Sequence, residues 1–123
     1  MKIKDLMKKP VVIKQDLSLS DVAKIMTKYS INSLIIANDE EILGIVTHHD
    51  MIKHFGESKN VYEIMNKQVL TLKENDKLQS AIQLVREKNI GIFPVVNSKN
   101  KIIGILDSKD ILKVWDDDDF MID

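Results

Sequence analysis

The chain contains the same arrangement of segments twice, and this repeat limits its possible folds more than any other feature. Residues 44–50 read Gly-Ile-Val-Thr-His-His-Asp, and residues 104–110 read Gly-Ile-Leu-Asp-Ser-Lys-Asp. Residues 31–38 and 90–97 form a second matching pair, so the two copies lie about 60 residues apart. A solenoid needs about three or more repeats, so two copies predict one module built from two similar units.

Both copies predict the same order of elements. In the first copy, apolar runs and helical spacing indicate strands at 11–13, 34–37 and 42–46, and helices at 19–29 and 50–55. In the second copy, the matching segments are 69–72, 78–85, 90–97, 102–106 and the stretch after Asp107. A short helical turn precedes each copy, and 56–60 is a polar linker in which Gly56 is placed to cap the preceding helix. We therefore expect an α+β fold with units at 1–57 and 58–115, followed by an acidic tail at 116–123.

Charge and composition exclude several classes of function. The chain has 123 residues, a net charge of −1 and no cysteine, so no basic field attracts nucleic acid and no disulfide or thiol chemistry is available. No apolar run approaches the roughly 20 residues that span a bilayer, and the N-terminus lacks the core of a signal peptide. The composition favours a cytoplasmic protein that binds neither nucleic acid nor membrane.

The junction at residues 46–50 is the strongest candidate for a binding site. A strand that runs straight into a helix presents free backbone N–H groups to an anion, and Thr47 adds a hydroxyl. Asp50, one turn later, can accept hydrogen bonds from a ribose. The same Thr47-x-x-Asp50 spacing also fits a capping box, in which the two residues bond each other's backbone amides. Both interpretations are open at this point.

The paired motifs and their order resemble the cystathionine-β-synthase (CBS) domain pair, also called a Bateman module, over residues 3–115. The resemblance implies two β-α-β-β-α units related by a pseudo-twofold axis, with their sheets packed together. It also implies clefts between the units that bind AMP, ADP, ATP or S-adenosylmethionine, with or without magnesium. Such modules are regulatory and not catalytic, and they pair into a flat homodimer.

The resemblance also implies roles for particular residues. Asp50 and Asp110 match the carboxylates that hold ribose hydroxyls, and Thr47 matches the hydroxyl that contacts phosphate. Asp107 departs from the family's Thr/Ser pattern and would repel phosphate, so we expect the first junction to be the better nucleotide site. The second is then empty, metal-bridged or suited to a ligand without phosphate there. Further phosphate candidates are Asn32, His48 and Ser108; base-pocket candidates, for which plain core is the alternative, are Val12, Ile31, Leu70 and Ile90.

Two other functions compete with a ligand sensor. One is a structural or assembly module whose clefts bind nothing. The other is a metal-dependent hydrolase using His48, His49 and Asp50, although the three histidines lack the i, i+4 spacing of a zinc site and no catalytic motif is present. We therefore expect no enzyme activity and no metal site. A chain of this length has no effector domain, so unless it is a fragment, its partner is a separate protein or a second copy.

Overall fold

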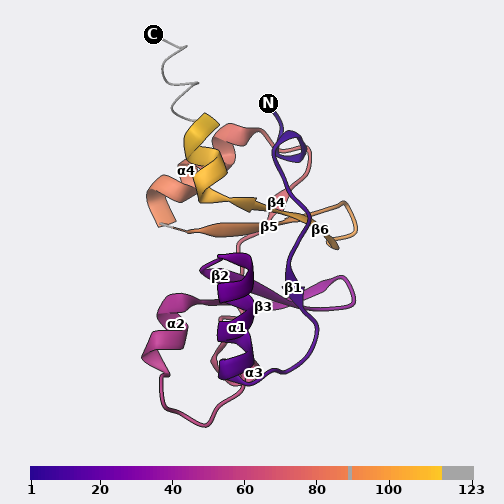
Figure 1. The fold of residues 1–123 in the computed structure, drawn as a ribbon. Helices are drawn as coiled ribbons and strands as arrows, with labels where there is room; N and C mark the ends of the chain where they lie inside the picture. The colour runs from indigo at the N-terminus through magenta and orange to yellow at the C-terminus, as the bar shows by residue number, and fades with distance from the viewer. Residues whose placement is uncertain (89, 115–123) are drawn as a thin grey trace. The chain divides into compact units, whose positions relative to one another are not determined.

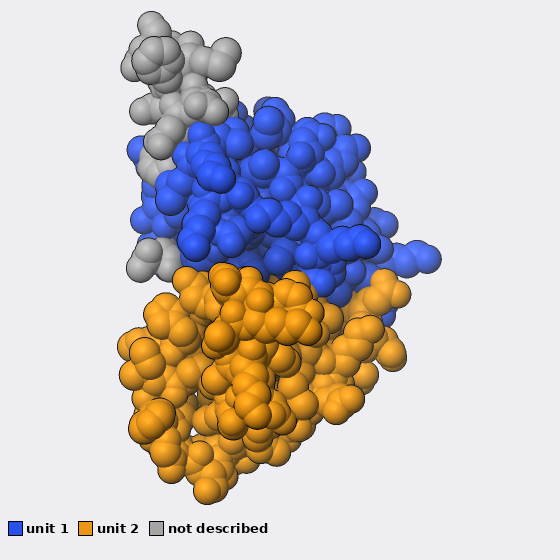
Figure 2. Space-filling model, viewed as in Figure 1, with its two compact units in different colours: residues 1–10, 70–123 blue, residues 11–69 orange. Residues whose placement is uncertain are grey.

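The computed structural model describes residues 1–88 and 90–114 and divides the chain into two compact units. One unit is formed by residues 11–69, and the other by residues 1–10 together with residues 70–88 and 90–114 (Figure 2). These units differ from the two sequence repeats, because a short N-terminal segment of each repeat packs with the other repeat.

The unit of residues 11–69 contains one three-stranded sheet and three helices (Figure 1). Its elements are β1 (Val12–Ile13), α1 (Leu19–Tyr29), β2 (Ser33–Asn38), β3 (Glu41–Thr47), α2 (His48–Lys53) and α3 (Val61–Ile64). The strand order is β1-β2-β3, with β1 parallel and β3 antiparallel to β2. Between β2 and β3, Asp39 adopts a left-handed φ of 54°, which fits the polar turn expected there.

Helix α1 packs its apolar stripe against this sheet. The helix begins because Ser18 Oγ accepts a hydrogen bond from the Asp21 amide at 3.1 Å, and it ends at Ser30, whose φ is 52°. Val22 and Met26 from α1 join a buried cluster with Val46 from β3 and Val61 from α3. These apolar contacts hold α1 and α3 against the strands, and Met51 of α2 packs against the same cluster.

The second unit repeats this architecture. Its elements are η1 (Ile3–Asp5), β4 (Leu72–Lys73), α4 (Leu78–Lys88), β5 (Ile92–Val96), β6 (Ile102–Asp107) and a helical stretch over residues 108–114. The order β4-β5-β6 and its parallel and antiparallel pairings match those of the first sheet. The core includes Phe93, which is fully buried, and Ile3 from the N-terminal turn.

The segment that follows each short helical turn, which contains Lys8 or Asn66 and is called the crossing segment below, pairs with the last strand of its unit next to a glycine. A Cβ at Gly104 would lie 2.9 Å from the Lys8 carbonyl oxygen, and a Cβ at Gly44 would lie 2.8 Å from Met65 Cγ. A side chain at Gly104 would therefore meet backbone of the crossing segment, whereas at Gly44 the contacts under 3.0 Å are with the Met65 side chain and the Asn66 carbonyl oxygen lies at 3.0 Å.

The predicted order of strands and helices is confirmed, and the bounds of several elements differ from those expected. Strands β1 and β4 have two residues each, and α2 covers 48–53 where 50–55 was expected. Gly56 does adopt a left-handed φ of 85°, but in the turn beyond the helix. The predicted acidic tail at 116–123 lies outside the described residues. Across residues 1–88 and 90–114, every helix is too short or too polar to cross a membrane.

Candidate functional site

The junction of β3 and α2 forms a complete capping box. The Thr47 amide donates to Asp50 Oδ2 at 2.9 Å, and the Asp50 amide donates to Thr47 Oγ1 at 3.3 Å. The Thr47 hydroxyl also donates to Asp50 Oδ2, at 3.0 Å. Both bonds that Asp50 accepts within the box reach Oδ2, which leaves Oδ1 outside the box. The half-buried carboxylate thus has a structural role and an oxygen that the role does not use.

A second set of bonds brings Asn32 to the same junction. The His48 amide donates to the Asn32 carbonyl oxygen at 2.8 Å, and Ser33 pairs with Thr47 across the sheet. The Ser33 hydroxyl donates to Asn32 Oδ1 at 3.3 Å. The structure therefore gathers four of the predicted residues, Asn32, Thr47, His48 and Asp50, around the start of α2.

The second junction, where β6 meets the helical stretch 108–114, has different chemistry. Asp107 Oδ1 accepts a hydrogen bond from the Lys109 amide at 2.7 Å, and the Ser108 amide donates to the Gly91 carbonyl oxygen at 2.9 Å. Lys8 Nζ lies 2.6 Å from Asp110 Oδ2 and forms an ion pair with it. The hydrogen bond with Asp110 is the main reason that the pKa of Lys8 is raised above its ordinary value of 10.5, and Asp107 adds to the effect. A lysine thus contacts the predicted ribose carboxylate of this repeat.

The predicted base-pocket residues divide by exposure. Ile31 and Ile90 are half-buried and pack against the two buried clusters, which agrees with the core alternative for those two. Val12 is half-buried in β1, and Leu70 is 45% exposed.

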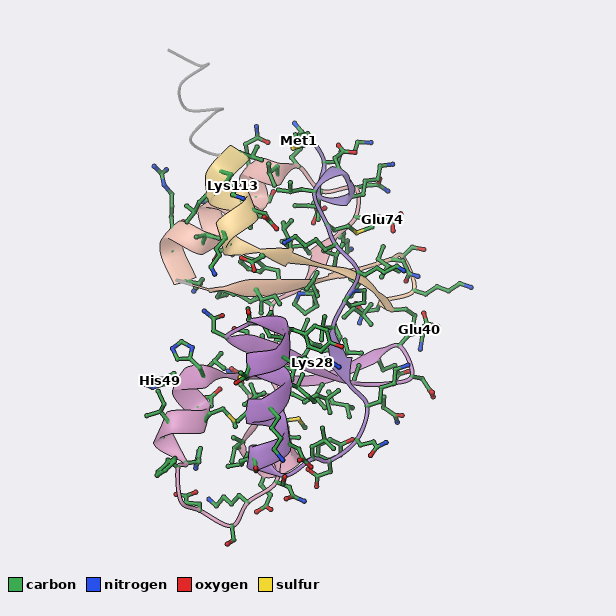
Figure 3. All side chains as sticks on the ribbon, in the orientation of Figure 1. Met1, Lys28, Glu40, His49, Glu74 and Lys113 are labelled. Atoms are coloured by element: carbon green, nitrogen blue, oxygen red, sulfur yellow. The ribbon has the colours of Figure 1, made fainter. Side chains whose placement is uncertain are left out.

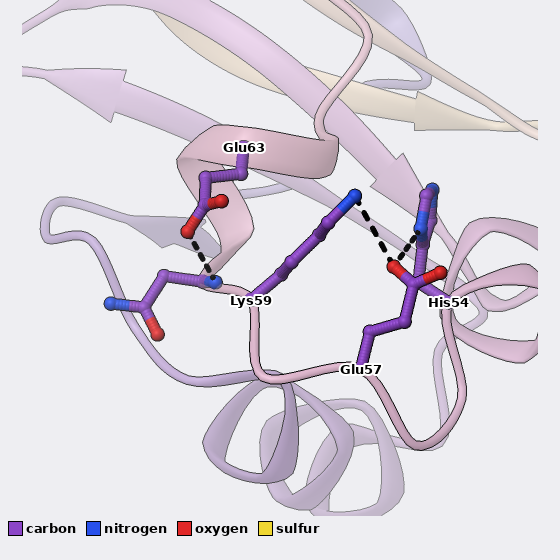
Figure 4. Close-up of polar contacts among 5 residues, drawn as sticks. His54, Glu57, Lys59 and Glu63 are labelled. Atoms are coloured by element: carbon purple, nitrogen blue, oxygen red, sulfur yellow. Dashed lines mark hydrogen bonds and ion pairs between the residues drawn. The ribbon is translucent and has the colours of Figure 1, made fainter.

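The three histidines of the first unit do not converge. His48 and His49 are exposed, and His49 lies at the outer edge of α2 (Figure 3). His54 Nδ1 lies 2.7 Å from Glu57 Oε2, and Lys59 Nζ lies 3.3 Å from the same oxygen (Figure 4). The bond from His54, helped by Lys59, lowers the pKa of Glu57 from its ordinary value of 4.5. Within the described ranges, no three His, Cys, Asp or Glu side chains are grouped as metal ligands would be.

A hollow of about 430 Å³ opens between α1 and α2, away from the predicted residues. Its lining is mainly apolar and includes neither Thr47 nor Asp50: Leu19, Ser20, Ala23, Met51, Ile52, His54, Phe55, Gly56 and Glu57. Phe55 is 89% exposed beside it. The hollow does not share the polar chemistry of the junction.

Sequence reasoning missed Lys8, although a signal for it was present. The N-terminal segment 4–7 recurs at 62–65, so Lys8 corresponds to Asn66. The replacement of a neutral residue by a cation at matched positions of a repeat marks a difference between the two junctions.

Comparison with known proteins gives a consistent result. The family model of the CBS domain matches residues 3–57 and 61–117. The structure is similar to the CBS domain pair of protein MJ0100 in complex with 5′-methylthioadenosine and S-adenosyl-L-methionine. The TM-score is 0.85 at 29% identity, over 96% of this chain and 98% of that chain. CBSX2 in complex with AMP shares the fold, with a TM-score of 0.83 at 23% identity over 92% and 94% of the two chains.

Two curated relatives from Methanocaldococcus jannaschii are enzymes much longer than this chain. Inosine-5′-monophosphate dehydrogenase is 30% identical over 104 residues, which is 84% of this chain and 21% of the dehydrogenase. L-aspartate semialdehyde sulfurtransferase is 30% identical over 116 residues, 92% of this chain and 23% of the sulfurtransferase. The chain therefore spans less than a quarter of either enzyme.

Proposed function

The chain belongs to the CBS domain family, and from that premise we propose that it binds an adenosine-containing ligand at the junction of β3 and α2. In this proposal Asp50 accepts hydrogen bonds from the ribose hydroxyls and Thr47 contacts phosphate, with Asn32 and His48 beside them. The observation that carries the proposal is the half-buried Asp50 carboxylate, whose Oδ1 lies outside the capping box. AMP, ADP, ATP and S-adenosylmethionine all offer the ribose diol that this group recognises.

The geometry of the capping box decides which oxygen of Asp50 a ligand hydroxyl can use without breaking an existing bond. A hydroxyl that donates to Asp50 Oδ1 leaves the box intact, whereas one that reaches Oδ2 competes with the Thr47 hydroxyl 3.0 Å away. A hydrogen bond to a charged group contributes about 1.5–3 kcal/mol, so the diol accounts for a large part of the affinity. The complex of the MJ0100 domain pair with two adenosine compounds supports this ligand class.

We propose a regulatory and not a catalytic role for the bound ligand. A ligand shifts a conformational equilibrium only as far as it prefers one arrangement over another. The response is then read by a second copy of the chain or by a separate effector protein. The enzymes among the relatives fit this role, because the matched region is a small part of each.

An assembly module that binds nothing is the second candidate. It is favoured by one observation, namely that Thr47 and Asp50 satisfy each other without a ligand. In that case the junction residues serve α2 alone, and the protein acts through association.

Titration calorimetry with matched variants separates the two. AMP, ADP, ATP and S-adenosylmethionine are titrated into the wild type, Asp50→Asn and Glu63→Gln, each with and without magnesium. Glu63 is the control because its Oε1 accepts the Asn60 amide at 3.2 Å at the start of α3 (Figure 4), so Glu63→Gln also neutralises a carboxylate that caps a helix of this unit. We expect one of these ligands to bind about tenfold or more weakly to Asp50→Asn and unchanged to Glu63→Gln.

The opposite results are equally clear. Equal affinity for the wild type and Asp50→Asn removes the proposed site, and no binding by any ligand favours the assembly module. Chromatography of the nucleotide after incubation tests for turnover, and hydrolysis that depends on added metal would instead favour the hydrolase.

A further inference from the structure

The two junctions receive equivalent residues from the crossing segments. The Lys8 amide donates to the Ile105 carbonyl oxygen at 2.9 Å and the Ile105 amide returns a bond at 3.0 Å. Asn66 and Ile45 exchange the same two bonds, at 2.8 and 3.0 Å. The backbone therefore holds Lys8 at one junction where it holds Asn66 at the other.

The second junction has Lys8 where the first has Asn66, and this difference compensates for the presence of Asp107 in place of Thr47. At the first junction, the Thr47 hydroxyl donates to Asp50 Oδ2. Asp107 has no hydroxyl to donate to Asp110, and at the second junction the Lys8 ammonium group lies on Asp110 Oδ2 instead. The cation offsets the extra carboxylate. Lys8, Asp107 and Asp110 therefore carry the same net charge together as Asn66, Thr47 and Asp50.

Asp110 Oδ2 is buried, so the ion pair with Lys8 keeps other hydrogen-bond donors away from this oxygen. Asp110 Oδ2 is shielded from solvent, and beyond the ion pair it accepts no regular hydrogen bond from the described residues. The Lys8 side chain is 57% exposed, so its ammonium group can move into water without a rearrangement of the backbone. A ribose diol that donates to both oxygens of Asp110 therefore competes with the ammonium group for Oδ2.

We propose that Lys8 is an intramolecular competitor for Asp110, so that an adenosine-type ligand binds both oxygens of this carboxylate only by displacing the Lys8 ammonium group from Oδ2. This inference rests on the proposed function, because it assumes the same ligand class. It makes Lys8 a residue that sets the difference in affinity between the two junctions.

The test isolates the second junction in an Asp50→Asn background. Adenosine is the probe, because it lacks the phosphate that Asp107 repels. It is titrated at low ionic strength into Asp50→Asn, Asp50→Asn with Lys8→Asn, and Asp50→Asn with Lys9→Asn. Lys9 is the matched control, since it is the exposed neighbour of Lys8 on the same segment. We expect Lys8→Asn to strengthen binding about two- to fivefold, the range of a partly exposed ion pair, and Lys9→Asn to leave it unchanged.

Each other outcome overturns the proposal. Weaker binding in Lys8→Asn means that the ammonium group contacts the ligand, and unchanged binding means that Lys8 does not block the site. Undetectable binding in all three variants means that the second junction does not take the ligand. Binding that persists when Asp110→Asn is added places the ligand elsewhere. A ligand-free readout is the ¹⁵N titration of Lys8 Nζ, whose pKa must fall toward 10.5 in Asp110→Asn. The proposed function is tested separately, by comparing the ligand affinity of the wild type with that of Asp50→Asn, because that comparison concerns the other junction.

Discussion

Thr47 and Asp50 cap α2 reciprocally: the Thr47 amide donates to Asp50 Oδ2 at 2.9 Å, and the Asp50 amide donates to Thr47 Oγ1 at 3.3 Å. Both residues therefore contribute to stability before any ligand arrives. When a variant of either residue loses ligand binding, a control variant that weakens the cap of another helix in the same unit shows whether the loss comes from the site or from stability.

Thr47→Ala should lower the free energy of unfolding by about 1 kcal/mol, because it removes the acceptor of the Asp50 amide. Thr47→Ser keeps the hydroxyl and should lower the free energy of unfolding by only about 0.3 kcal/mol. Urea unfolding measures both values. Equal losses in the two variants would show that the methyl group of Thr47, and not its hydroxyl, carries the effect.

Gly104→Ala should destabilise the protein by about 1–3 kcal/mol, since its Cβ would meet the Lys8 carbonyl oxygen at 2.9 Å. Gly44→Ala should cost less, because its nearest contact is the flexible end of Met65 at 2.8 Å. Thermal unfolding of the two variants gives the order. A more stable Gly104→Ala would mean that the crossing segment does not lie against β6.

Phe93→Ala should cost about 3–5 kcal/mol, because this side chain is fully buried in β5. Phe55→Ala is the control, as Phe55 is 89% exposed, and it should change the free energy of unfolding by less than about 0.5 kcal/mol. Denaturant unfolding decides, and a large loss in Phe55→Ala would contradict the exposure of that ring.

The Glu57 carboxylate gives a pH-dependent contribution to stability. Because its pKa is lowered in the folded state, this contribution is present above about pH 4.5 and is lost as the pH falls through the folded value. Unfolding measured from pH 3 to 7 should therefore show a smaller acid loss in Glu57→Gln than in the wild type. High salt should reduce the difference, since the cluster is exposed. Identical profiles at low salt would show that the His54–Glu57 contact does not persist in solution.

The elements with strong apolar periodicity could be predicted from sequence. The stripe from Val22 to Met26 led to α1 because it gives the helix one buried face, and the uninterrupted apolar run at 34–37 led to β2 because that strand is buried at consecutive residues. The capping interpretation of Thr47 and Asp50 is confirmed, because it depends on residues three apart. Their role in ligand binding stays a prediction.

The contact between Lys8 and Asp110 could not be predicted in the same way. It joins residues about 100 positions apart and depends on which strand the segment after η1 pairs with. The early end of α2 at Lys53 likewise depends on the turn through Gly56 and not on the pattern of the helix itself.

The most direct test of ligand binding at the β3–α2 junction is an amide ¹H–¹⁵N NMR titration with AMP and, separately, S-adenosylmethionine. We expect the largest shift changes at the amides of Thr47, His48 and Asp50, and we expect Asp50→Asn to abolish them while Glu63→Gln preserves them. Shift changes centred instead on the hollow beside Ile52 and Phe55, or none with either ligand, would contradict the account.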